Sequence, residues 1–279
     1  MNKIGIAFLC GELFFCAVVR AQEPADRVTV PLTDPSRPAR IRAHLLFGSI
    51  TVRGADVRDV EVTTHRRMDG GRHEHEHERE HPEPPPPPGM KRLDSPPALD
   101  VVETDNVVNI KTGVWGSSSD LVVTVPRHSS LELKTVNGGG ITVEGVDGEI
   151  DADELNGSIT LKDVSGSVVA HSLNGAVNVV LDQVDASKPM SFSTMNGDID
   201  VTLPENARAN LRMKTDNGAI YSDFDVKLSG GQSFTTDSGH HDGAYHIRLD
   251  RTLHGTINGG GPEYQFTSFN GRIYIRKKK

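Results

Sequence analysis

A recurring Asn-Gly pair constrains this chain more than any other feature of its sequence. The pairs begin at Asn137, Asn156, Asn174, Asn196 and Asn217, and lie 19, 18, 22 and 21 residues apart. Asn and Gly tolerate positive φ angles, so each pair can turn the backbone sharply at low steric cost. We therefore interpret each pair as a corner between two short extended segments.

The residues around each corner alternate with the period of a β-strand. Apolar residues stand just before the corner and again two and four residues after the Gly, as in Leu155, Ile159 and Leu161. Thr160 and Lys162 lie between them. Successive side chains of a strand point to opposite faces, so this pattern predicts one dry face and one wet face, with Leu155 and its counterpart Leu173 on the dry side.

A unit this small cannot bury its apolar side alone, so repetition at a fixed period predicts coils that stack into a continuous core. The fold class that we expect is all-β, as a single-domain parallel β-solenoid of about 18–22 residues per coil. Parallel connections within one sheet are nearly always right-handed, so we favour a right-handed β-helix.

A longer echo links two distant parts of the chain. Val123-Thr-Val-Pro126 leads to Leu131-Glu-Leu-Lys-Thr and a corner, and Val201-Thr-Leu-Pro204 leads to Leu211-Arg-Met-Lys-Thr and a corner. Proline cannot donate to a strand ladder, so the two prolines are expected to end strands at equivalent positions of two coils.

The chain divides into regions of different composition. Residues 1–21 combine Lys3, an apolar stretch and Ala21, which is typical of a signal peptide and predicts a secreted or periplasmic protein. No later stretch approaches the ~20 apolar residues that span a bilayer. We assign 22–64 to N-terminal strands and a first coil, and 65–97 to a disordered His/Glu- and Pro-rich insertion. The range 98–279 is assigned to the repeat domain, with the corner copy at 269–275 as a terminal coil or cap.

Within 22–64, alternating residues predict strands at 28–32, 39–53 and 57–64. Both cysteines, Cys10 and Cys16, precede residue 22, so the mature chain is expected to contain no disulfide. The formal net charge of −8 disfavours nucleic acid as a partner.

The V-x-V-P segment ending at Pro126 and the corners at Asn137 to Asn217, with a further one at Asn270, resemble a known family. They are similar to the bacterial extracytoplasmic adhesin domains of unknown function, whose coils repeat N-G-x-[IV]-x-[LVA]. The resemblance spans most of 99–275 and implies a β-solenoid fold and an adhesin label, without catalytic residues to transfer. The insertion at 65–97 departs from the family pattern.

The insertion carries the strongest chemical signal. Imidazoles at His73, His75, His77 and His81 could share Zn²⁺, Ni²⁺ or Cu²⁺, the ions that suit nitrogen ligands. Such a site would be weak and exchangeable, and no tightly bound cofactor is expected. The alternative is a solvated linker of mixed charge.

Two further chemistries are alternatives to a plain solvated surface for the acidic residues and the outer faces of the coils. Stacked carboxylates could bind calcium; the candidates are Asp147, Glu149, Asp151, Asp153, Glu154, Asp163, Asp182, Asp198 and Asp200. A carbohydrate-active β-helix enzyme would need a base or two carboxylates in a groove, but no catalytic motif stands out.

We therefore expect a protein that is not an enzyme and acts as an adhesin, scaffold or cell-envelope interaction module. Its partner would be an envelope or surface component, protein or glycan. A metal-binding periplasmic protein that uses the insertion is the alternative. Neither the partner's identity nor the oligomeric state follows from the sequence.

Overall fold

The computed structural model describes residues 26–66, 99–112, 119–229, 236–241, 244–249 and 252–279. All regular structure in these ranges is β-strand, so the predicted all-β class is confirmed there. None of the described residues belongs to a helix that could cross a membrane. The expected signal peptide and almost all of the 65–97 insertion lie outside the described residues, and both remain predictions.

The strands follow the alternating segments of the sequence closely. Predicted strands at 28–32, 39–53 and 57–64 correspond to the first three observed. In chain order the strands are β1 (Asp26–Val30), β2 (Ala39–Ala55), β3 (Val60–Arg66), β4 (Leu99–Thr104), β5 (Val107–Thr112), β6 (Ser119–Pro126), β7 (Ser129–Glu144), β8 (Asp147–Asn156), β9 (Ile159–Asn174), β10 (Val177–Val184), β11 (Met190–Asn196), β12 (Ile199–Leu203), β13 (Ala209–Asn217), β14 (Ile220–Ser222), β15 (Lys227–Leu228), β16 (Thr236–His241), β17 (Ala244–Leu249), β18 (Leu253–Ile257), β19 (Glu263–Asn270) and β20 (Ile273–Lys277).

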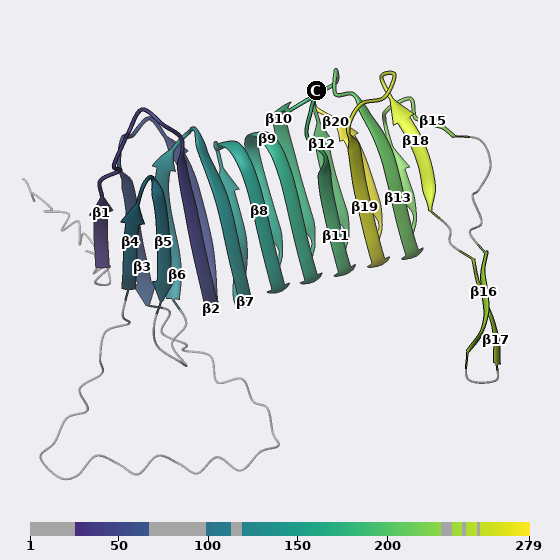
Figure 1. Ribbon diagram of the computed structural model, residues 1–279, viewed down its shortest axis with the longest axis horizontal. Coiled ribbons are helices and arrows are strands. Elements are labelled where there is room, and N and C mark those ends of the chain that lie inside the picture. The colour runs from purple at the N-terminus through teal and green to yellow at the C-terminus, as the bar shows by residue number, and fades with distance from the viewer. Residues whose placement is uncertain (1–25, 67–98, 113–118, 230–235, 242–243, 250–251) are drawn as a thin grey trace, which may run out of the picture.

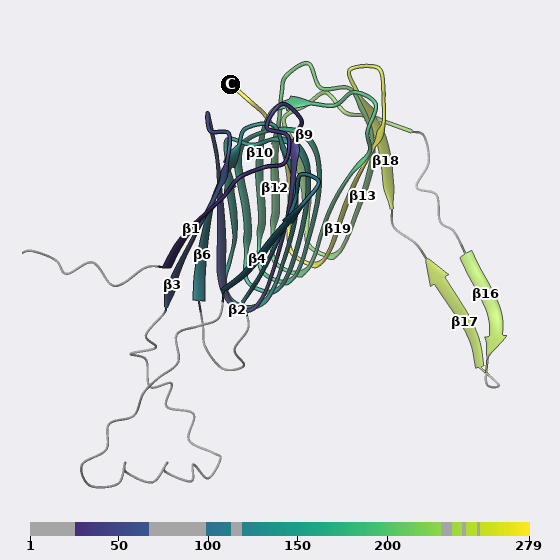
Figure 2. The same cartoon turned by 60° about the vertical axis from the view of Figure 1, so that its left-hand side comes forward.

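Eighteen of these strands form one hydrogen-bonded sheet that folds over itself. We call the segments before each corner the leading face and the segments after it the trailing face. β2, β7 and β9 are long enough to serve both faces, and Figure 2 shows the ribbons curving from one face into the other. Most pairings within each face are parallel, as the repeat predicts. We call one leading segment with its trailing segment a coil.

The coils do not stack in the order of the sequence. From one end, the pairings give β5–β6, then β2, then β7, then the coils built from β8, β9 and β10. Next come β11–β12, β19–β20 and β13–β14. In Figure 1 the purple β2 therefore stands among teal strands, and the yellow β19 stands between the green β11 and β13.

Each displaced coil fills a slot that the chain leaves open. After β6 the chain steps over β2 to begin β7, and after β12 it steps over β19–β20 to begin β13. Adjacent strands lie about 4.8 Å apart, so each step covers roughly twice that spacing. These steps begin at Pro126 and Pro204, so the two echoed sequence blocks mark the two places where the chain skips a coil.

The position of the last corner copy corrects one expectation. Residues 269–275 were predicted to form a terminal coil or cap, but they lie inside the stack, paired on both sides. Antiparallel strands cover the ends instead. β4 pairs with β5 and β3 with β6 at one end, and β18 pairs with β13 at the other. The hairpin β16–β17 pairs only with itself among the described strands.

The core lies between the two faces. Ile159, Leu161, Val168 and Val177, which the alternation places inward, are all at most 1% exposed. Thr160 and Lys162 face outward as predicted. Burial of an aliphatic side chain of this size stabilises a fold by roughly 1.5–3 kcal/mol, so the apolar rows hold the coils together.

The residue before the corner does not follow the prediction. Leu155 is 40% exposed and Leu173 is half-buried, whereas Glu154 is 2% exposed. Ala152 points inward, so a period of two also directs Glu154 inward and turns Leu155 outward. The expectation that Leu155 and Leu173 lie on the dry side was therefore wrong.

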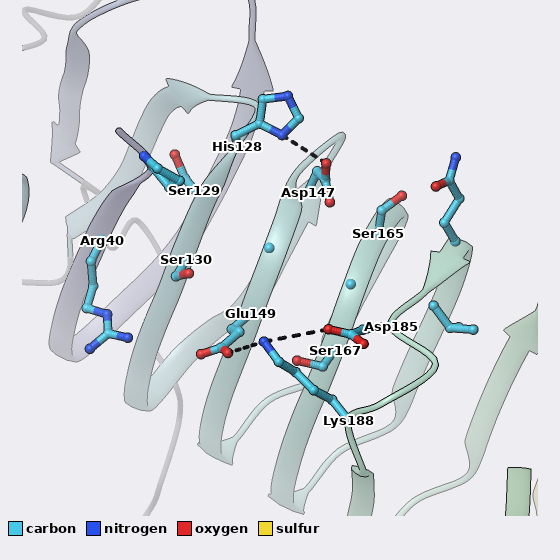
Figure 3. Close-up of a pocket in the computed structure, with 15 residues that line it drawn as sticks. Arg40, His128, Ser129, Ser130, Asp147, Glu149, Ser165, Ser167, Asp185 and Lys188 are labelled. Atoms are coloured by element: carbon cyan, nitrogen blue, oxygen red, sulfur yellow. Dashed lines mark hydrogen bonds and ion pairs between the residues drawn. The ribbon is translucent and has the colours of Figure 1, made fainter. Parts of the chain in front are cut away.

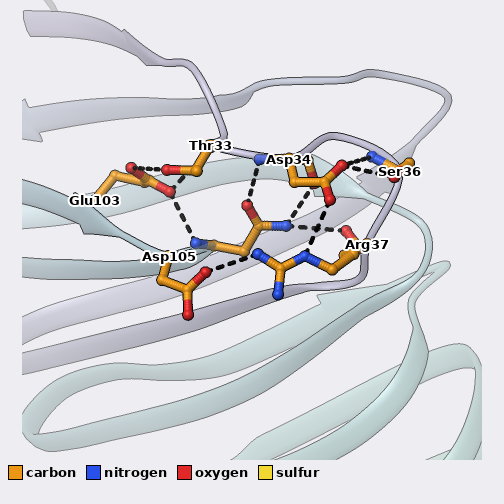
Figure 4. Close-up of polar contacts among 7 residues, drawn as sticks. Thr33, Asp34, Ser36, Arg37, Glu103 and Asp105 are labelled. Carbon is orange, nitrogen blue, oxygen red and sulfur yellow. Dashed lines mark hydrogen bonds and ion pairs between the residues drawn. The ribbon is translucent and has the colours of Figure 1, made fainter.

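A polar clamp fixes the chain where it enters β2 (Figure 4). Asn106, which is 4% exposed, accepts a hydrogen bond from the Asp34 amide at 2.7 Å and donates to the Asp34 carbonyl at 2.6 Å. Glu103 accepts from the backbone and the hydroxyl of Thr33, both at 3.1 Å. Arg37 bridges Asp34 and Asp105. The loop before β2 is thereby tied to the β4–β5 hairpin.

Candidate functional site

The corner edge of the stack carries a continuous ladder of asparagine side chains. Beyond Asn137, each Nδ2 donates to the Oδ1 of the neighbouring asparagine on the Asn137 side, over 2.7–2.9 Å. The spatial order is Asn137, Asn156, Asn174, Asn196, Asn270 and Asn217. Inside this ladder, hydroxyl groups donate to glycine carbonyls of the neighbouring corner; they belong to Thr135, Ser172, Thr194, Ser268 and Thr215.

Glu154 occupies the place that a hydroxyl residue holds in these other coils. Its carboxyl lies near the Asn156 amide and the Thr135 hydroxyl, but neither oxygen makes a well-formed hydrogen bond. Burial therefore raises the pKa of Glu154. The corner beside it, Asn137 to Ile141, is one residue longer than the corner from Asn156 to Ile159.

A row of exposed apolar side chains runs directly beside the asparagine ladder. We call it the corner row; its members precede every corner except the one at Asn217, which follows Asp216, and are Leu46, Val136, Leu155, Leu173, Met195 and Phe269. Four of them are 40–50% exposed, and Val136 and Leu173 are half-buried. Six neighbouring strands at about 4.8 Å span roughly 24 Å. Exposed large apolar groups gathered in one line are more informative than scattered ones, because such patches are typical of interaction surfaces.

A polar groove opens on the leading face, at the starts of β2, β7 and β8 and in the middle of β9, where the leading segment of β9 begins (Figure 3). Its volume is about 570 Å³, and serines and glycines form its floor. Gly166 has a φ of +109°, and a Cβ there would lie 2.2 Å from the Gly148 carbonyl oxygen. The floor therefore depends on glycine at this position.

Charged side chains line the groove in opposed pairs. Lys188, from the loop after β10, reaches Glu149 of β8 at 2.5 Å and approaches Asp185 at 3.7 Å. His128 contacts Asp147 at 2.9 Å. The hydrogen bond from Lys188 lowers the pKa of Glu149 and in turn raises the pKa of Lys188, while hydrogen bonds from Ser187 lower the pKa of Asp185. Glu149 and Asp185 are therefore held in their ionised forms.

A second hollow continues the groove along β8 past Asp151. Burial and the neighbouring Asp153 raise the pKa of Asp151. Glu149 and Asp151 are two residues apart on the same side of one strand, and their pKa values shift in opposite directions. Paired carboxyls with divergent pKa values are a feature of acid–base sites.

The predicted metal ligands His73, His75, His77 and His81 lie outside the described residues, so the metal hypothesis stays a prediction. Among the described residues, no three or more His, Cys, Asp or Glu side chains are gathered closely enough to hold a metal ion. The acidic residues proposed for calcium are dispersed: Asp147 and Glu149 line the groove, Glu154 is buried, and Asp198 and Asp200 pair with Arg272 and Arg276.

No protein-family model matches the sequence, and no curated protein matches it significantly. A proposed cell adhesion protein from Clostridium sporogenes is similar in structure, with 10% identity and a TM-score of 0.44, covering 91% of this chain and 100% of that one. A proposed adhesin from Bacteroides fragilis has 12% identity and a TM-score of 0.33, covering 92% and 98%. Similarity at this level assigns no function to this chain.

Proposed function

We propose that the protein is a secreted or periplasmic β-solenoid, right-handed in its coiling, that acts without catalysis as an adhesion, scaffold or cell-envelope interaction module. The corner row is the observation that carries this proposal. In Leu155, Met195 and Phe269 the chain keeps large apolar side chains that are 40–45% exposed, where the fold itself requires only an outward-facing residue. A protein or glycan of the envelope that covers this row would remove apolar surface from water, which favours association by roughly 25 cal/mol per Å².

Binding to an envelope fraction tests the proposal. The variant Leu155→Ser with Met195→Ser should lose most of the retention shown by the wild-type protein, because both side chains lie in the corner row. Its melting temperature should change little, since both positions are exposed. A matched control replaces two exposed apolar residues outside the row, Val102→Ser with Leu228→Ser.

Comparing the retention of the two double variants tests whether the corner row is the contact surface. Retention that falls only in the Leu155/Met195 variant supports the corner row as the contact surface. Equal retention of both variants at the wild-type level would contradict the proposal. Protease treatment of the envelope fraction then separates a protein partner, whose binding is lost, from a glycan partner, whose binding persists.

A second candidate function rests on Glu149 and Asp151. Their opposed pKa shifts and shared groove are what a carbohydrate-active enzyme would use, with Asp151, whose pKa is raised, as acid and Glu149, whose pKa is lowered, as base or nucleophile. Glu149 is already engaged by Lys188, which is why we rank this function second. Hydrolysis or cleavage of a polysaccharide panel that is lost in Asp151→Asn, with folding intact, would reverse the ranking.

A further inference from the structure

The coil formed by β19 and β20 is the most completely enclosed segment near the end of the stack. On the leading face β19 pairs with β11 on one side and β13 on the other. On the trailing face β20 pairs with β12 and β14. Residues 263–277 thus fill a slot whose two walls are edges of other coils. Without them, both walls would expose unpaired backbone N–H and C=O groups, which are a template for an added strand.

The side chains that enter this slot are large and apolar. Tyr264, Phe266, Ile273 and Ile275 are each 0% exposed, and the Phe266 ring stacks on Phe192 with centroids 5.1 Å apart. Burial of these side chains therefore supplies much of the free energy that holds the segment in the slot. Pockets for every second side chain act in the same way when a strand is added to the edge of a sheet.

The slot also selects a register. Asn270 donates to Asn196 at 2.8 Å and accepts from Asn217 at 2.9 Å, so it completes the asparagine ladder across the slot. A Cβ at Gly271 would lie 1.8 Å from the Gly197 carbonyl oxygen, so the residue after the asparagine has to be glycine. Asn-Gly at this point therefore matches the corners on both sides of the slot.

The walls of the slot are connected independently of its occupant. The connection from β12 to β13 passes over the slot and meets the turn that leads into β19. There the Asn258 amide donates to the carbonyls of Glu205 at 2.9 Å and Ala207 at 2.7 Å. This turn contains Asn258, Gly259 and Gly260, all with positive φ. It joins the segment to the rest of the chain without taking part in the slot's ladders.

From this geometry we propose that the slot between β11–β12 and β13–β14 is a binding site for an extended segment with the pattern of residues 263–277. In the structure the chain's own segment occupies it, and the same segment of a second copy can replace it. The contacts within the slot are identical in the two cases, as in domain swapping, so only the turn at 258–260 and the protein concentration decide between them.

Exchange of the segment in a nicked but otherwise complete chain tests this proposal. A protease recognition site is inserted between Gly259 and Gly260, the full chain is folded, and the site is then cut. A fluorescent peptide of residues 260–279 is added in excess and followed by size exclusion. We expect the peptide to enter at one per chain as the original fragment leaves. A peptide with Phe266→Asp should bind at least about a hundredfold more weakly, because the slot would bury an unpaired charge.

Two further arms complete the experiment. If the inserted site prevents folding, the same cut is made at residues 250–251 and the peptide spans 252–279. In the intact chain at high concentration, Asn258→Ala should raise the yield of a dimer severalfold. The proposal is overturned if the labelled peptide never enters just below the unfolding temperature, if the Phe266→Asp peptide enters equally well, or if the intact chain forms no dimer.

Discussion

The two displaced coils, β2 near the start of the chain and β19–β20 near its end, reach equivalent places by opposite routes. Each lies one coil in from an end of the parallel stack, and each fills a slot that the chain skips after a V-T-x-P block. β2 comes before both of its neighbouring coils in the sequence, so those coils pair with a strand that is already present. β19–β20 comes after both of its neighbouring coils in the sequence, so it fills a gap between them.

The two coils also differ in how they are held. Near β2, Arg127 Nε pairs with Asp56 Oδ1 at 3.0 Å and the Arg127 amide donates to the Ala55 carbonyl at 3.2 Å. Near β19, the neutral amide of Asn258 bonds two carbonyls. At its corner β2 carries Phe47 in place of asparagine and stands outside the ladder, whereas Asn270 is part of it. The coil of β2 is thus held without the asparagine ladder, whereas the ladder runs through the coil of β19–β20.

The largest difference is expected from a charge buried at matching positions. Ile50 and Ile273 are each three residues past the corner residue and 0% exposed. An unpaired Asp at either site costs several kcal/mol, comparable to the whole stability of a domain. Ile50→Asp should abolish cooperative folding, because coils on both sides are built on β2. Ile273→Asp should unfold the last coils and leave β7 to β10 protected in hydrogen exchange.

A surface substitution next to one of these sites serves as the control. Thr51 faces outward, so Thr51→Asp should melt close to the wild-type temperature. The same pattern of hydrogen-exchange protection in Ile50→Asp and Ile273→Asp would contradict this difference between the coil of β2 and the coil of β19–β20.

A smaller difference in stability is expected between variants of the two residues that hold the skipping connections, Asn258 near β19 and Arg127 near β2. Asn258→Ala removes two hydrogen bonds to backbone carbonyls and should cost about 1–2 kcal/mol in urea denaturation. Arg127→Ala breaks a pair in which the Asp56 side chain is 88% exposed, so its cost should be under about 1 kcal/mol and should shrink in high salt. Equal costs for the two variants at low and high salt would remove the contrast.

The smallest effect concerns acid. Hydrogen bonds from Ser36 lower the pKa of Asp34, and the Thr33 and Asn106 amides lower the pKa of Glu103. A carboxyl whose pKa is lower in the folded than in the unfolded chain adds stability above the unfolded pKa, and that stability is lost as pH falls through the folded pKa. The clamp before β2 should therefore loosen below about pH 4, where β19 should not.

Hydrogen exchange at pH 6 and pH 3, corrected for intrinsic rates, measures this difference. The Arg40 amide, which donates to the Asn106 carbonyl at 2.8 Å, reports on the clamp. Its protection should fall more than that of the β19 amides, and Glu103→Gln should reduce the change. A uniform loss of protection in both coils would contradict the assignment of the acid response to the clamp.

Much of the fold follows from the sequence because strand period and corner chemistry are local. The alternation around Ile159 and Leu161 predicts which side chains are buried, and the Asn-Gly corners predict where coils bend. Stack order is not local, since any coil edge offers the same backbone groups to any other coil. The echo ending at Pro126 and Pro204 does mark both skipped coils, but its meaning becomes clear only once the neighbours of β2 and β19 are known.

The candidate surfaces were harder to predict than the fold. Hydrophobicity alone puts Leu155 inside and Glu154 outside, but the phase set by Ala152 reverses both. The groove depends on Lys188, whose approach to Glu149 links residues 39 positions apart and leaves no pattern in the sequence. The sequence signal for the corner row is an apolar residue before nearly every corner, and hydrophobicity alone predicts that such residues are core.

Cross-linking of introduced cysteines tests the order of the stack most directly. Thr267 is paired with Ser193 on one side and Lys214 on the other. Neighbouring strands bring Cα atoms within the 4.4–6.8 Å range of a disulfide, and next-nearest strands do not. With Cys10 and Cys16 replaced by Ser, the account predicts disulfides for the 193/267 and 267/214 pairs and none for the 193/214 pair. A disulfide between positions 193 and 214, with none to 267, would contradict the account.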